Sequence, residues 1–175
     1  MAALTGDLEE EAEWPTRASD YEVQGLVGEG AFAKVYKARC PARGVDVAIK
    51  VIDLEKVTSS LEDIMNEVKA MKQTNHPNVL SCHSAFVADN TLWLVMPLMD
   101  KGSCLHIMRQ LKKAGYGEGM RQEWCAAIIK ATVQGLKYLH EQGYIHRDIK
   151  VHFGASWGGW GWEGGFGWFL GCLGS

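Results

Sequence analysis

Two stretches of this sequence carry residue types that suit the binding of phosphate groups. The first, GEGAFAKV at residues 28–35, is a glycine-rich turn between two stretches with strand pattern. Glycine lets a backbone approach a ligand closely, so the amides of such a turn can lie over phosphates. A simple turn without a ligand remains the alternative. A dinucleotide loop of the kind that opens a helix is excluded, because a strand follows this turn.

The second stretch is VAIK at residues 47–50, inside an apolar strand that comes directly after the glycine turn. Because side chains alternate along a strand, Lys50 shares a face with Ala48 and lies opposite Ile49. A lysine on that face needs an anion, which Glu67 of the next helical stretch or phosphate oxygens could supply. Taken alone, each residue has a plainer interpretation, as a solvated strand lysine and a surface glutamate.

A third motif, HRDIK at residues 146–150, follows the end of a long helical stretch. Each of its residues is common on protein surfaces. Their occurrence in this order, after the glycine turn and the strand lysine, is hard to explain by chance. The motif is typical of the start of a catalytic loop.

The residue pattern also predicts the elements that must position these motifs. Strand pattern begins at Tyr21, brackets the glycine turn and continues through VDVAIKVID at 45–53. A helix with an apolar stripe follows, with Ser60 as its N-cap and HPN at 76–78 as its end. Two further strands are predicted around a turn at 88–90.

Two helices are predicted in the second half of the chain. One covers about 103–113, with Ser103 as its cap, and the other covers about 122–141, with Gly143 at its C-terminal stop. The residues expected to face inward on the longer helix are Trp124, Ile128, Ala131, Leu136 and Leu139. The stripe expected on the earlier helix comprises Leu61, Ile64, Met65, Val68 and Met71.

Composition is that of an ordinary globular domain. The 175 residues are 47% hydrophobic and 22% charged, with a net charge of -3, so a nucleic-acid or membrane-surface partner is not expected. The five cysteines lack metal-site spacing and are expected to be free thiols. The acidic start, residues 1–20, predicts a flexible tail rather than a signal peptide, and a cytoplasmic location.

The order of these motifs resembles that of the eukaryotic protein kinases, over residues 14–150. The Ile-Lys after HRD is similar to the serine/threonine kinases. Several stretches are similar to sterile-20-like kinases of the oxidative-stress-responsive/Fray type, namely WPTRASDYEV, GEGAFAKV, MKQTNHPNV and LWLVMPLMDKGSCLHIM. VMPLMDKGSCLHIM particularly resembles plant and green-algal members.

The resemblance implies an α+β, protein-kinase-like fold, with a five-stranded antiparallel small lobe that carries one major helix. Residues 21–99 would form the small lobe and hinge, and 100–150 the start of an incomplete helical large lobe. The implied activity is transfer of the ATP γ-phosphate to serine or threonine of proteins. The implied partners are ATP and the protein substrates or scaffold proteins of a kinase cascade, and the full-length family uses Mg²⁺. The sequence does not predict an oligomeric state.

The resemblance also implies a nucleotide-binding set, which comprises Val27, Gly28, Gly30, Ala33, Val35, Ala48, Lys50, Glu67, Met96, Leu98 and Met99. Gly28, Gly30 and Ala33 would form a flap over the phosphates. Val35 and Ala48 would enclose the adenine. Ala33 stands where many kinases have a third loop glycine, and this subfamily is similar in that respect.

Lys50 would hold the α- and β-phosphates and be oriented by an ion pair with Glu67. Met96 would be the gatekeeper beside the adenine. Residues 97–99 would form the hinge, whose backbone would bond the adenine. Together these roles predict a complete nucleotide site in the first hundred residues.

The predicted catalytic loop departs from the family after its start. Asp148 would orient the substrate hydroxyl and accept its proton, and Lys150 would steady the γ-phosphate. The family's metal-binding asparagine, five residues after the aspartate, is replaced by Phe153, and no DFG or APE motif follows. Residues 151–175 form a glycine- and tryptophan-rich segment without helical or strand period, expected to be disordered. Because magnesium supplies much of the catalysis, little or no activity is expected.

Three functions therefore remain open from the sequence. The first is a kinase, and the second is a nucleotide- or partner-binding module without catalysis. The third is a non-functional product of a retained intron, because tryptophan and glycine codons are rich in G and the codons at 150–151 are compatible with a splice donor. This third possibility predicts poor solubility, since the helices at 103–113 and 122–141 would expose apolar faces.

Overall fold

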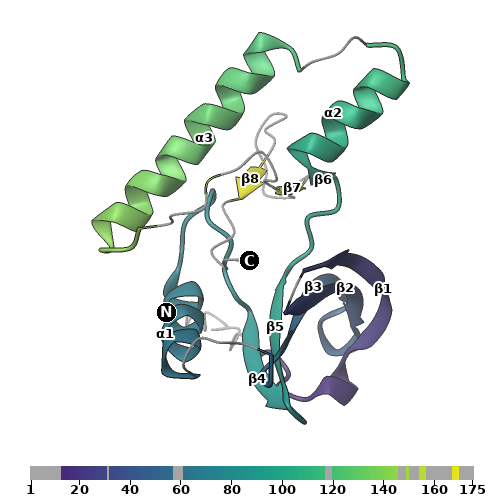
Figure 1. Cartoon of the computed structure of the whole chain (residues 1–175), viewed down its shortest axis with the longest axis vertical. Coiled ribbons are helices and arrows are strands. Elements are labelled where there is room, and N and C mark those ends of the chain that lie inside the picture. The colour runs from purple at the N-terminus through teal and green to yellow at the C-terminus, as the bar shows by residue number, and fades with distance from the viewer. Residues whose placement is uncertain are drawn as a thin grey trace, which may run out of the picture.

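The computed structural model of the chain describes residues 13–30, 32–56, 61–116, 120–145, 149, 154–156 and 167–169. Five strands form one antiparallel sheet in the order β1-β2-β3-β5-β4. The strands are β1 Glu22–Glu29, β2 Ala33–Cys40, β3 Val45–Asp53, β4 Ser84–Ala88 and β5 Thr91–Pro97. The helices are α1 Leu61–Gln73, α2 Cys104–Lys113 and α3 Gln122–Glu141. Figure 1 shows two regions, the sheet with α1 and the pair α2 and α3.

Two turns of the sheet use left-handed backbone. The β2–β3 connection is the short 3-10 helix Pro41–Arg43 followed by Gly44, whose φ of 63° suits a residue without a side chain. The β4–β5 turn places Asp89 at a φ of 51°, a conformation that aspartate tolerates better than most residues. Both turns are two to four residues long, so the strands that they join pair directly, as the sequence predicted.

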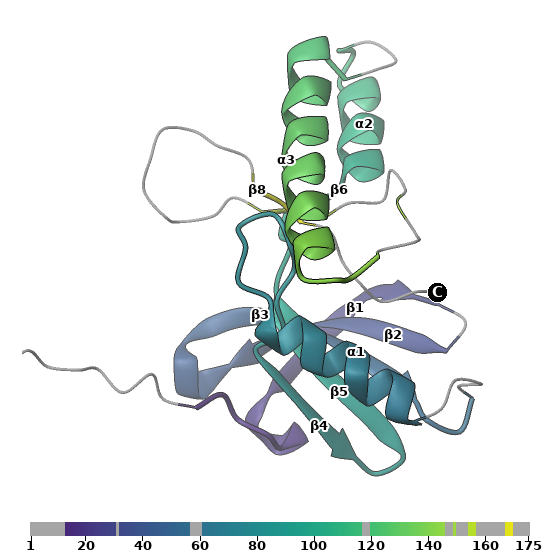
Figure 2. The same cartoon turned by 90° about the vertical axis from the view of Figure 1, so that its left-hand side faces the viewer.

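The face of the sheet that α1 covers, here called the inner face, carries one hydrophobic cluster (Figure 2). Its buried members are Ile52, Ile64, Val68, Met71, Cys82, Leu92, Leu94 and Met96. The predicted stripe of α1 is confirmed for Ile64, Val68 and Met71, but Met65 is 54% exposed. The prediction was wrong for Met65. The sheet covers a narrower strip of the helix surface than the five apolar residues span, so Met65 lies beyond its edge.

The opposite face, here called the outer face, carries a second cluster, and the N-terminal segment lies against it. Its buried members are Tyr21, Ala38, Cys40, Val47, Ile49 and Val95, with Trp14, Val51, Phe86 and Trp93 packed on them. The sequence predicted a flexible tail through residue 20. The structure instead gives residues 13–20 fixed contacts and a 3-10 helix, Ala18–Asp20, because Trp14 and Tyr21 bury apolar surface there.

The helices α2 and α3 begin and end where the sequence predicted. The Ser103 hydroxyl accepts a hydrogen bond of 3.1 Å from the backbone N–H of His106, which caps α2. Gly143 has a φ of 81° just after α3, as expected of a C-terminal stop. A small cluster of Cys104, Ile128 and Ala131 joins the two helices. Leu139 is also buried, whereas Trp124 and Leu136 are half-buried.

A second, three-stranded sheet lies between the two regions. It consists of β6 Gly102–Ser103, β7 Gly154–Ser156 and β8 Gly167–Phe169, paired antiparallel in that order. The last two strands fall in a segment where the sequence had no strand period. The difference arises because strand pairing is made by backbone groups, which such a segment offers whatever its side chains are.

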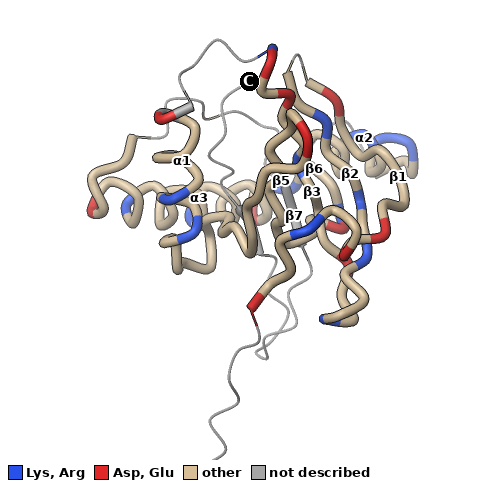
Figure 3. The backbone as a smooth tube through the Cα atoms, turned by 90° about the horizontal axis from the view of Figure 1, so that it is seen from below, with Lys and Arg blue, Asp and Glu red and all other residues tan. Residues whose placement is uncertain are grey.

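Charged residues are spread over the molecule. Figure 3 shows basic and acidic residues interspersed along the strands rather than gathered on one side. Among the described residues, no group of three or more histidine, cysteine or acidic side chains could hold a metal ion. The described helices include none that is long and apolar enough to cross a membrane.

Candidate functional site

Strand register places four of the predicted nucleotide-binding residues together on the inner face. Val35 on β2 pairs with Lys50 on β3. Ala48, two residues before Lys50, pairs with Met96 on β5. Ala48 and Met96 are buried, with 8% and 6% of their surface exposed, while Val35 and Lys50 are half-buried. A small residue next to a partly accessible valine and lysine leaves the kind of flat apolar surface that a planar base could cover.

The glycine turn between β1 and β2 lies at one end of this surface. The Gly30 N–H donates to the Ala33 carbonyl oxygen at 2.8 Å, which closes the turn. Among the described residues, a Cβ added at Gly28 would meet no atom within 4 Å, and one at Gly30 would meet only the Ala33 oxygen at 3.6 Å. The glycines are therefore not required by internal packing, and their backbone stays accessible to a ligand.

The neighbouring Val27 is 62% exposed although it is apolar. The β1–β2 register is irregular just here, between Leu26 and Gly28, so Val27 has no direct partner on β2. Such an irregularity bends a strand and re-aims the side chain that it releases. An exposed valine at this position is available to cover one side of a ligand.

The predicted hinge follows the end of β5. Met96 belongs to the inner cluster, and Leu98 and Met99 after it are half-buried. The Gly102 N–H donates to the Met99 carbonyl oxygen at 3.1 Å, which turns the chain into β6 and α2. The residues expected at the gatekeeper and hinge positions thus lie between the sheet and the helix pair.

Several predicted residues cannot be placed in the same way. Glu67 lies on α1 next to the buried Val68, but its side chain is outside the described residues. His146, Arg147, Asp148 and Lys150 are also outside them, as is Phe153. Their proposed roles and the ion pair between Lys50 and Glu67 therefore stay predictions.

One contact that the sequence did not predict joins α3 to the end of α1. The Tyr138 hydroxyl oxygen accepts a hydrogen bond of 3.1 Å from the backbone N–H of Asn75. The ring of Tyr138 also stacks on His76, with centroids 5.0 Å apart. Desolvation lowers the pKa of His76 below its usual value, which favours the neutral imidazole in this stack. The HPN motif was seen only as a helix end, although polar residues after a helix can also be anchors.

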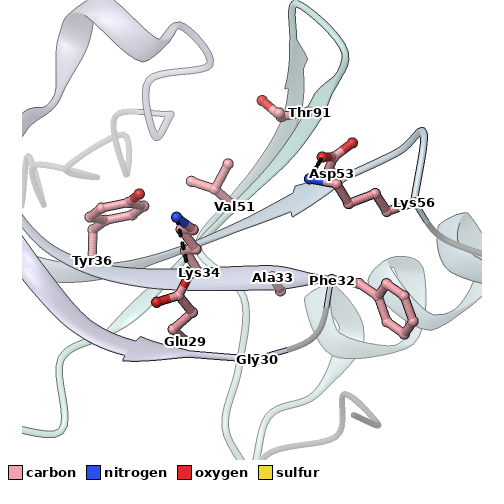
Figure 4. Close-up of a pocket in the computed structure, with 10 residues that line it drawn as sticks. All are labelled: Glu29, Gly30, Phe32, Ala33, Lys34, Tyr36, Val51, Asp53, Lys56 and Thr91. Atoms are coloured by element: carbon pink, nitrogen blue, oxygen red, sulfur yellow. Dashed lines mark ion pairs between the residues drawn. The ribbon is translucent and has the colours of Figure 1, made fainter.

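A pocket of about 330 Å³ lies beside the glycine turn, but on the outer face. Figure 4 shows the side chains that line it, among them Tyr36 and Val51, and two ion pairs, Glu29–Lys34 at 3.1 Å and Asp53–Lys56 at 2.7 Å. Lys34 on β2 pairs with Val51 on β3, and this pair is next to the pair Val35–Lys50 in the strand register. Because successive side chains alternate, this pocket lies on the face opposite Val35 and Lys50, although Gly30 and Ala33 of the predicted phosphate flap also line it.

Comparison with known families decides what this arrangement belongs to. Residues 21–152 match the family model described as protein kinase domain, which includes both lobes of the described structure up to the predicted catalytic loop. The chain belongs to the protein kinase family. Its five-stranded sheet with α1 is the small lobe, and α2 and α3 belong to a partial large lobe, which confirms the predicted α+β, protein-kinase-like fold.

Curated relatives refine the assignment within this family. Germinal center kinase 3 of Caenorhabditis elegans is 42% identical over 153 residues, which cover 85% of this chain and 26% of that protein. Serine/threonine-protein kinase fray1 of Dictyostelium discoideum is 37% identical, covering 79% of the chain and 24% of fray1. For fray2 of the same organism the identity is 38%, covering 78% of the chain and 13% of fray2. This protein kinase chain thus spans about a quarter or less of the length of these relatives.

These relatives support the predicted resemblance to sterile-20-like serine/threonine kinases. The relatives are named germinal center kinase or fray. These names agree with the Fray-type resemblance that was inferred from the stretches WPTRASDYEV to LWLVMPLMDKGSCLHIM. The match to the kinase domain ends at residue 152, just before Phe153. The chemistry expected of kinases must therefore be judged separately for the nucleotide site and for the catalytic loop.

Proposed function

We propose that this chain is the ATP-binding part of a serine/threonine protein kinase of the sterile-20-like, Fray type. The observation that carries the proposal is the shared inner face of Val35, Ala48, Lys50 and Met96 beside an accessible glycine turn. In the whole protein, the activity would be transfer of the ATP γ-phosphate to serine or threonine of protein substrates. The same proposal implies a cytoplasmic protein of a kinase cascade, of a type similar to plant and green-algal members.

The residues of the inner face fit ATP in chemical type. Val27 and Val35 would cover one side of the adenine, and Ala48 leaves room for the ring because its side chain is one methyl group. Leu98 and Met99 would present the hinge backbone to the adenine edge. The backbone amides at Gly28 and Gly30 would lie over the phosphates, as accessible glycines allow.

Charge for the phosphates would come from Lys50, oriented by Glu67 of α1. A lysine that is half-buried on an apolar face gains most from a multiply charged partner, since the surrounding dielectric is lower than that of water. ATP supplies such a partner through its α- and β-phosphate oxygens. Lys50 is therefore the residue whose loss should weaken binding most.

The catalytic loop fits less well. Asp148 would orient the substrate hydroxyl and accept its proton, and Lys150 would steady the γ-phosphate. Phe153, five residues after Asp148, has no oxygen that could bind magnesium, a cation that takes oxygen ligands. The donor set of this loop therefore does not fit the metal. This mismatch favours a second candidate function, a nucleotide- or partner-binding module that transfers phosphate weakly or not at all.

A binding experiment tests the first proposal. A fluorescent ATP analogue is titrated into the 175-residue chain, its Lys50→Met variant and its Lys34→Met variant. Lys34 is the matched control, because it lies one residue from Val35 but on the outer face, paired with Glu29. We expect Lys50→Met to weaken binding by about tenfold or more, about 1.4 kcal/mol, and Lys34→Met to leave it nearly unchanged. Equal binding by all three proteins would refute the proposed site.

A turnover experiment separates the two candidate functions. Phosphate transfer from ATP to a general protein substrate such as casein is measured with magnesium present, for the chain and its Asp148→Asn variant. Transfer that is lost in Asp148→Asn supports the kinase, and ATP binding without any transfer supports the binding module. Reading the native transcript across codon 150 tests the retained-intron alternative, which requires a splice donor there.

A further inference from the structure

The N-terminal segment of residues 13–21 is fastened to the start of β4. The Pro15 carbonyl oxygen accepts two hydrogen bonds, from the Tyr21 hydroxyl at 2.7 Å and from the Ser84 hydroxyl at 3.0 Å. The Trp14 ring stacks on His83, with centroids 4.0 Å apart and planes 7° from parallel. Figure 2 shows this purple segment running beside β4 at the edge of the sheet. These contacts hold the backbone on both sides of Thr16 in a defined place.

A pocket of about 380 Å³ opens where this segment meets three other parts of the chain. Thr16 and Glu13 come from the segment, Arg43 from the β2–β3 turn, Lys72 from the last turn of α1, and His83 from just before β4. Most of the residues that line the pocket are polar or charged. None of its lining residues belongs to the set assigned to the nucleotide site.

The pocket has a positive electrostatic balance. Arg43 and Lys72 are cations, and Glu13 is the carboxylate among the lining residues. Burial, aided by the charge of Arg43, lowers the pKa of His83 to about 4, so this imidazole is neutral at pH 7. The charge of Lys72 acts on Cys82, the residue before His83, where it partly opposes the rise that burial causes in the pKa of that thiol. Among the described residues that line the pocket, one negative and two positive groups leave an excess of positive charge.

Arg43 is also held in position. Its guanidinium carbon lies 4.6 Å from the centroid of the Trp14 ring, within the range of a cation–π contact. Trp14 is itself stacked on His83, so the guanidinium rests on a ring that cannot move freely. A planar, oriented guanidinium is well suited to bind two oxygens of a phosphate at once.

We propose that this pocket is a receptor for a phosphate monoester, and that its source is phosphorylated Thr16. The Thr16 side chain is exposed, so a modifying enzyme can reach it, and it lines the same pocket as Arg43 and Lys72. A phosphate there would carry a charge of about −2 and three acceptor oxygens. It would join the N-terminal segment to the β2–β3 turn and to the end of α1.

The modification is an ordinary phosphoryl transfer from ATP by a serine/threonine kinase acting in trans. The Thr16 Oγ–phosphorus bond forms, and the bond from the γ-phosphorus to the bridging oxygen breaks. ADP leaves with that electron pair, and the hydroxyl proton passes to the base of the modifying kinase. The proposal concerns the pocket alone and does not depend on whether this chain binds ATP.

Phosphorus NMR of the 175-residue chain with phosphothreonine incorporated at position 16 tests the proposal. A phosphate that is bound by two cations should titrate below the usual value of about 6, by about one pH unit. Arg43→Gln and Lys72→Gln should each return the titration toward 6. Lys69→Gln is the matched control, because Lys69 is an exposed residue of α1 that does not line the pocket and should leave the shift unchanged.

Two outcomes would overturn the proposal. One is a phosphate on Thr16 that titrates at about 6 in the otherwise unchanged chain. If inorganic phosphate then binds the unmodified chain in a way that needs Arg43 and Lys72, the pocket is an anion site whose ligand comes from outside the chain. The other is a lowered titration that neither Arg43→Gln nor Lys72→Gln returns toward 6, which would mean that these two cations do not hold the phosphate. Both readouts are spectroscopic and remain valid if a variant is less stable.

Discussion

The small-lobe sheet and the helix pair of this chain are built in contrasting ways. The sheet is buried on both faces, by α1 on the inner face and by the N-terminal segment on the outer face. The helices α2 and α3 share a small cluster of three buried residues, and α3 leaves Ile129 and Val133 more than half exposed. The sheet therefore carries its own core, whereas the helix pair relies on few contacts. The proposed nucleotide surface lies on the part that holds its own shape.

Among the residues that the structure describes, specific contacts connect the two regions, and none of the three buried hydrophobic clusters spans both. Figure 1 shows α3 reaching down toward the end of α1. There the Tyr138 ring and hydroxyl contact His76 and the backbone of Asn75. In the described part of the chain, the position of α3 relative to α1 therefore depends on these polar and aromatic contacts. Four predictions test this difference between the regions, from the largest expected effect to the smallest.

The largest effect is expected in the sheet. Leu94→Ala, at a fully buried position of the inner cluster, should lower the free energy of unfolding by about 3 kcal/mol. Ile128→Ala, in the small cluster of the helix pair, should cost less, about 2 kcal/mol. Urea unfolding monitored by circular dichroism measures both. Equal losses would contradict the view that the sheet has the denser core.

The second effect concerns pH and the outer face. The folded pKa of His83 is about 4, below the usual 6.5, so the unfolded state binds the proton more tightly. Stability should therefore be full above pH 6.5 and fall as the pH drops toward 4. The full shift corresponds to about 3 kcal/mol, and solvent screening at this partly exposed site should reduce it to roughly 1–2 kcal/mol.

Thermal melts between pH 7 and 4.5 measure this loss. His83→Phe keeps a ring against Trp14 but cannot take up a proton, so its melting temperature should vary less with pH. His76 also has a lowered pKa and contributes in the same direction, so the informative quantity is the difference between the two proteins. Parallel pH profiles would show that His83 is not the cause.

The third effect concerns the contact between the regions. Tyr138→Phe removes the hydroxyl that accepts the Asn75 N–H and keeps the ring against His76, which should cost about 0.5–1 kcal/mol. Hydrogen exchange should become faster in α3 and at Asn75 and remain unchanged in β3 and β5. Tyr116→Phe is a suitable control, because Tyr116 is 77% exposed. Uniformly faster exchange throughout the sheet would contradict the separation of the two regions.

The smallest effect on stability is expected on the exposed face of α3. Ile129→Lys together with Val133→Glu should change the free energy of unfolding by no more than about 0.5 kcal/mol, since both side chains lie largely in water. The same pair of changes should reduce self-association, because it interrupts an exposed apolar patch. Sedimentation of the chain at several concentrations measures this. A large loss of stability would mean that these residues pack more tightly than the structure describes.

The fold could be predicted from the sequence wherever a short-range pattern has one physical meaning. Alternation along residues 45–53 put Lys50 opposite Ile49, and the register with β2 and β5 agrees. Ser103 and Gly143 marked helix ends because a capping hydroxyl and a left-handed glycine act within one turn. The order of motifs identified the family, and the kinase-domain match agrees.

Features made by distant parts of the chain could not be predicted. Trp14 was assigned to a tail, because nothing near it in sequence indicates that His83 and Arg43 will meet its ring. Tyr138 had the pattern of any half-buried helix residue, yet its hydroxyl meets a backbone amide 63 positions away. Met65 was expected to be buried but is exposed. Periodicity shows which side of a helix faces the core, but it does not show how much of that side the sheet will cover.

The sequence by itself determined the strands of the five-stranded sheet, the three helices and the residue types of a nucleotide site, because alternation, helical period and capping are local effects of backbone geometry. It also determined that Phe153 stands where kinases bind magnesium through asparagine. Only the tertiary structure decided that the sheet is covered on both faces, that the pocket beside the glycine turn lies on the outer face, and that Arg43, Lys72 and Thr16 line one pocket. These depend on which surfaces exclude water from one another, and that is settled by the whole chain at once.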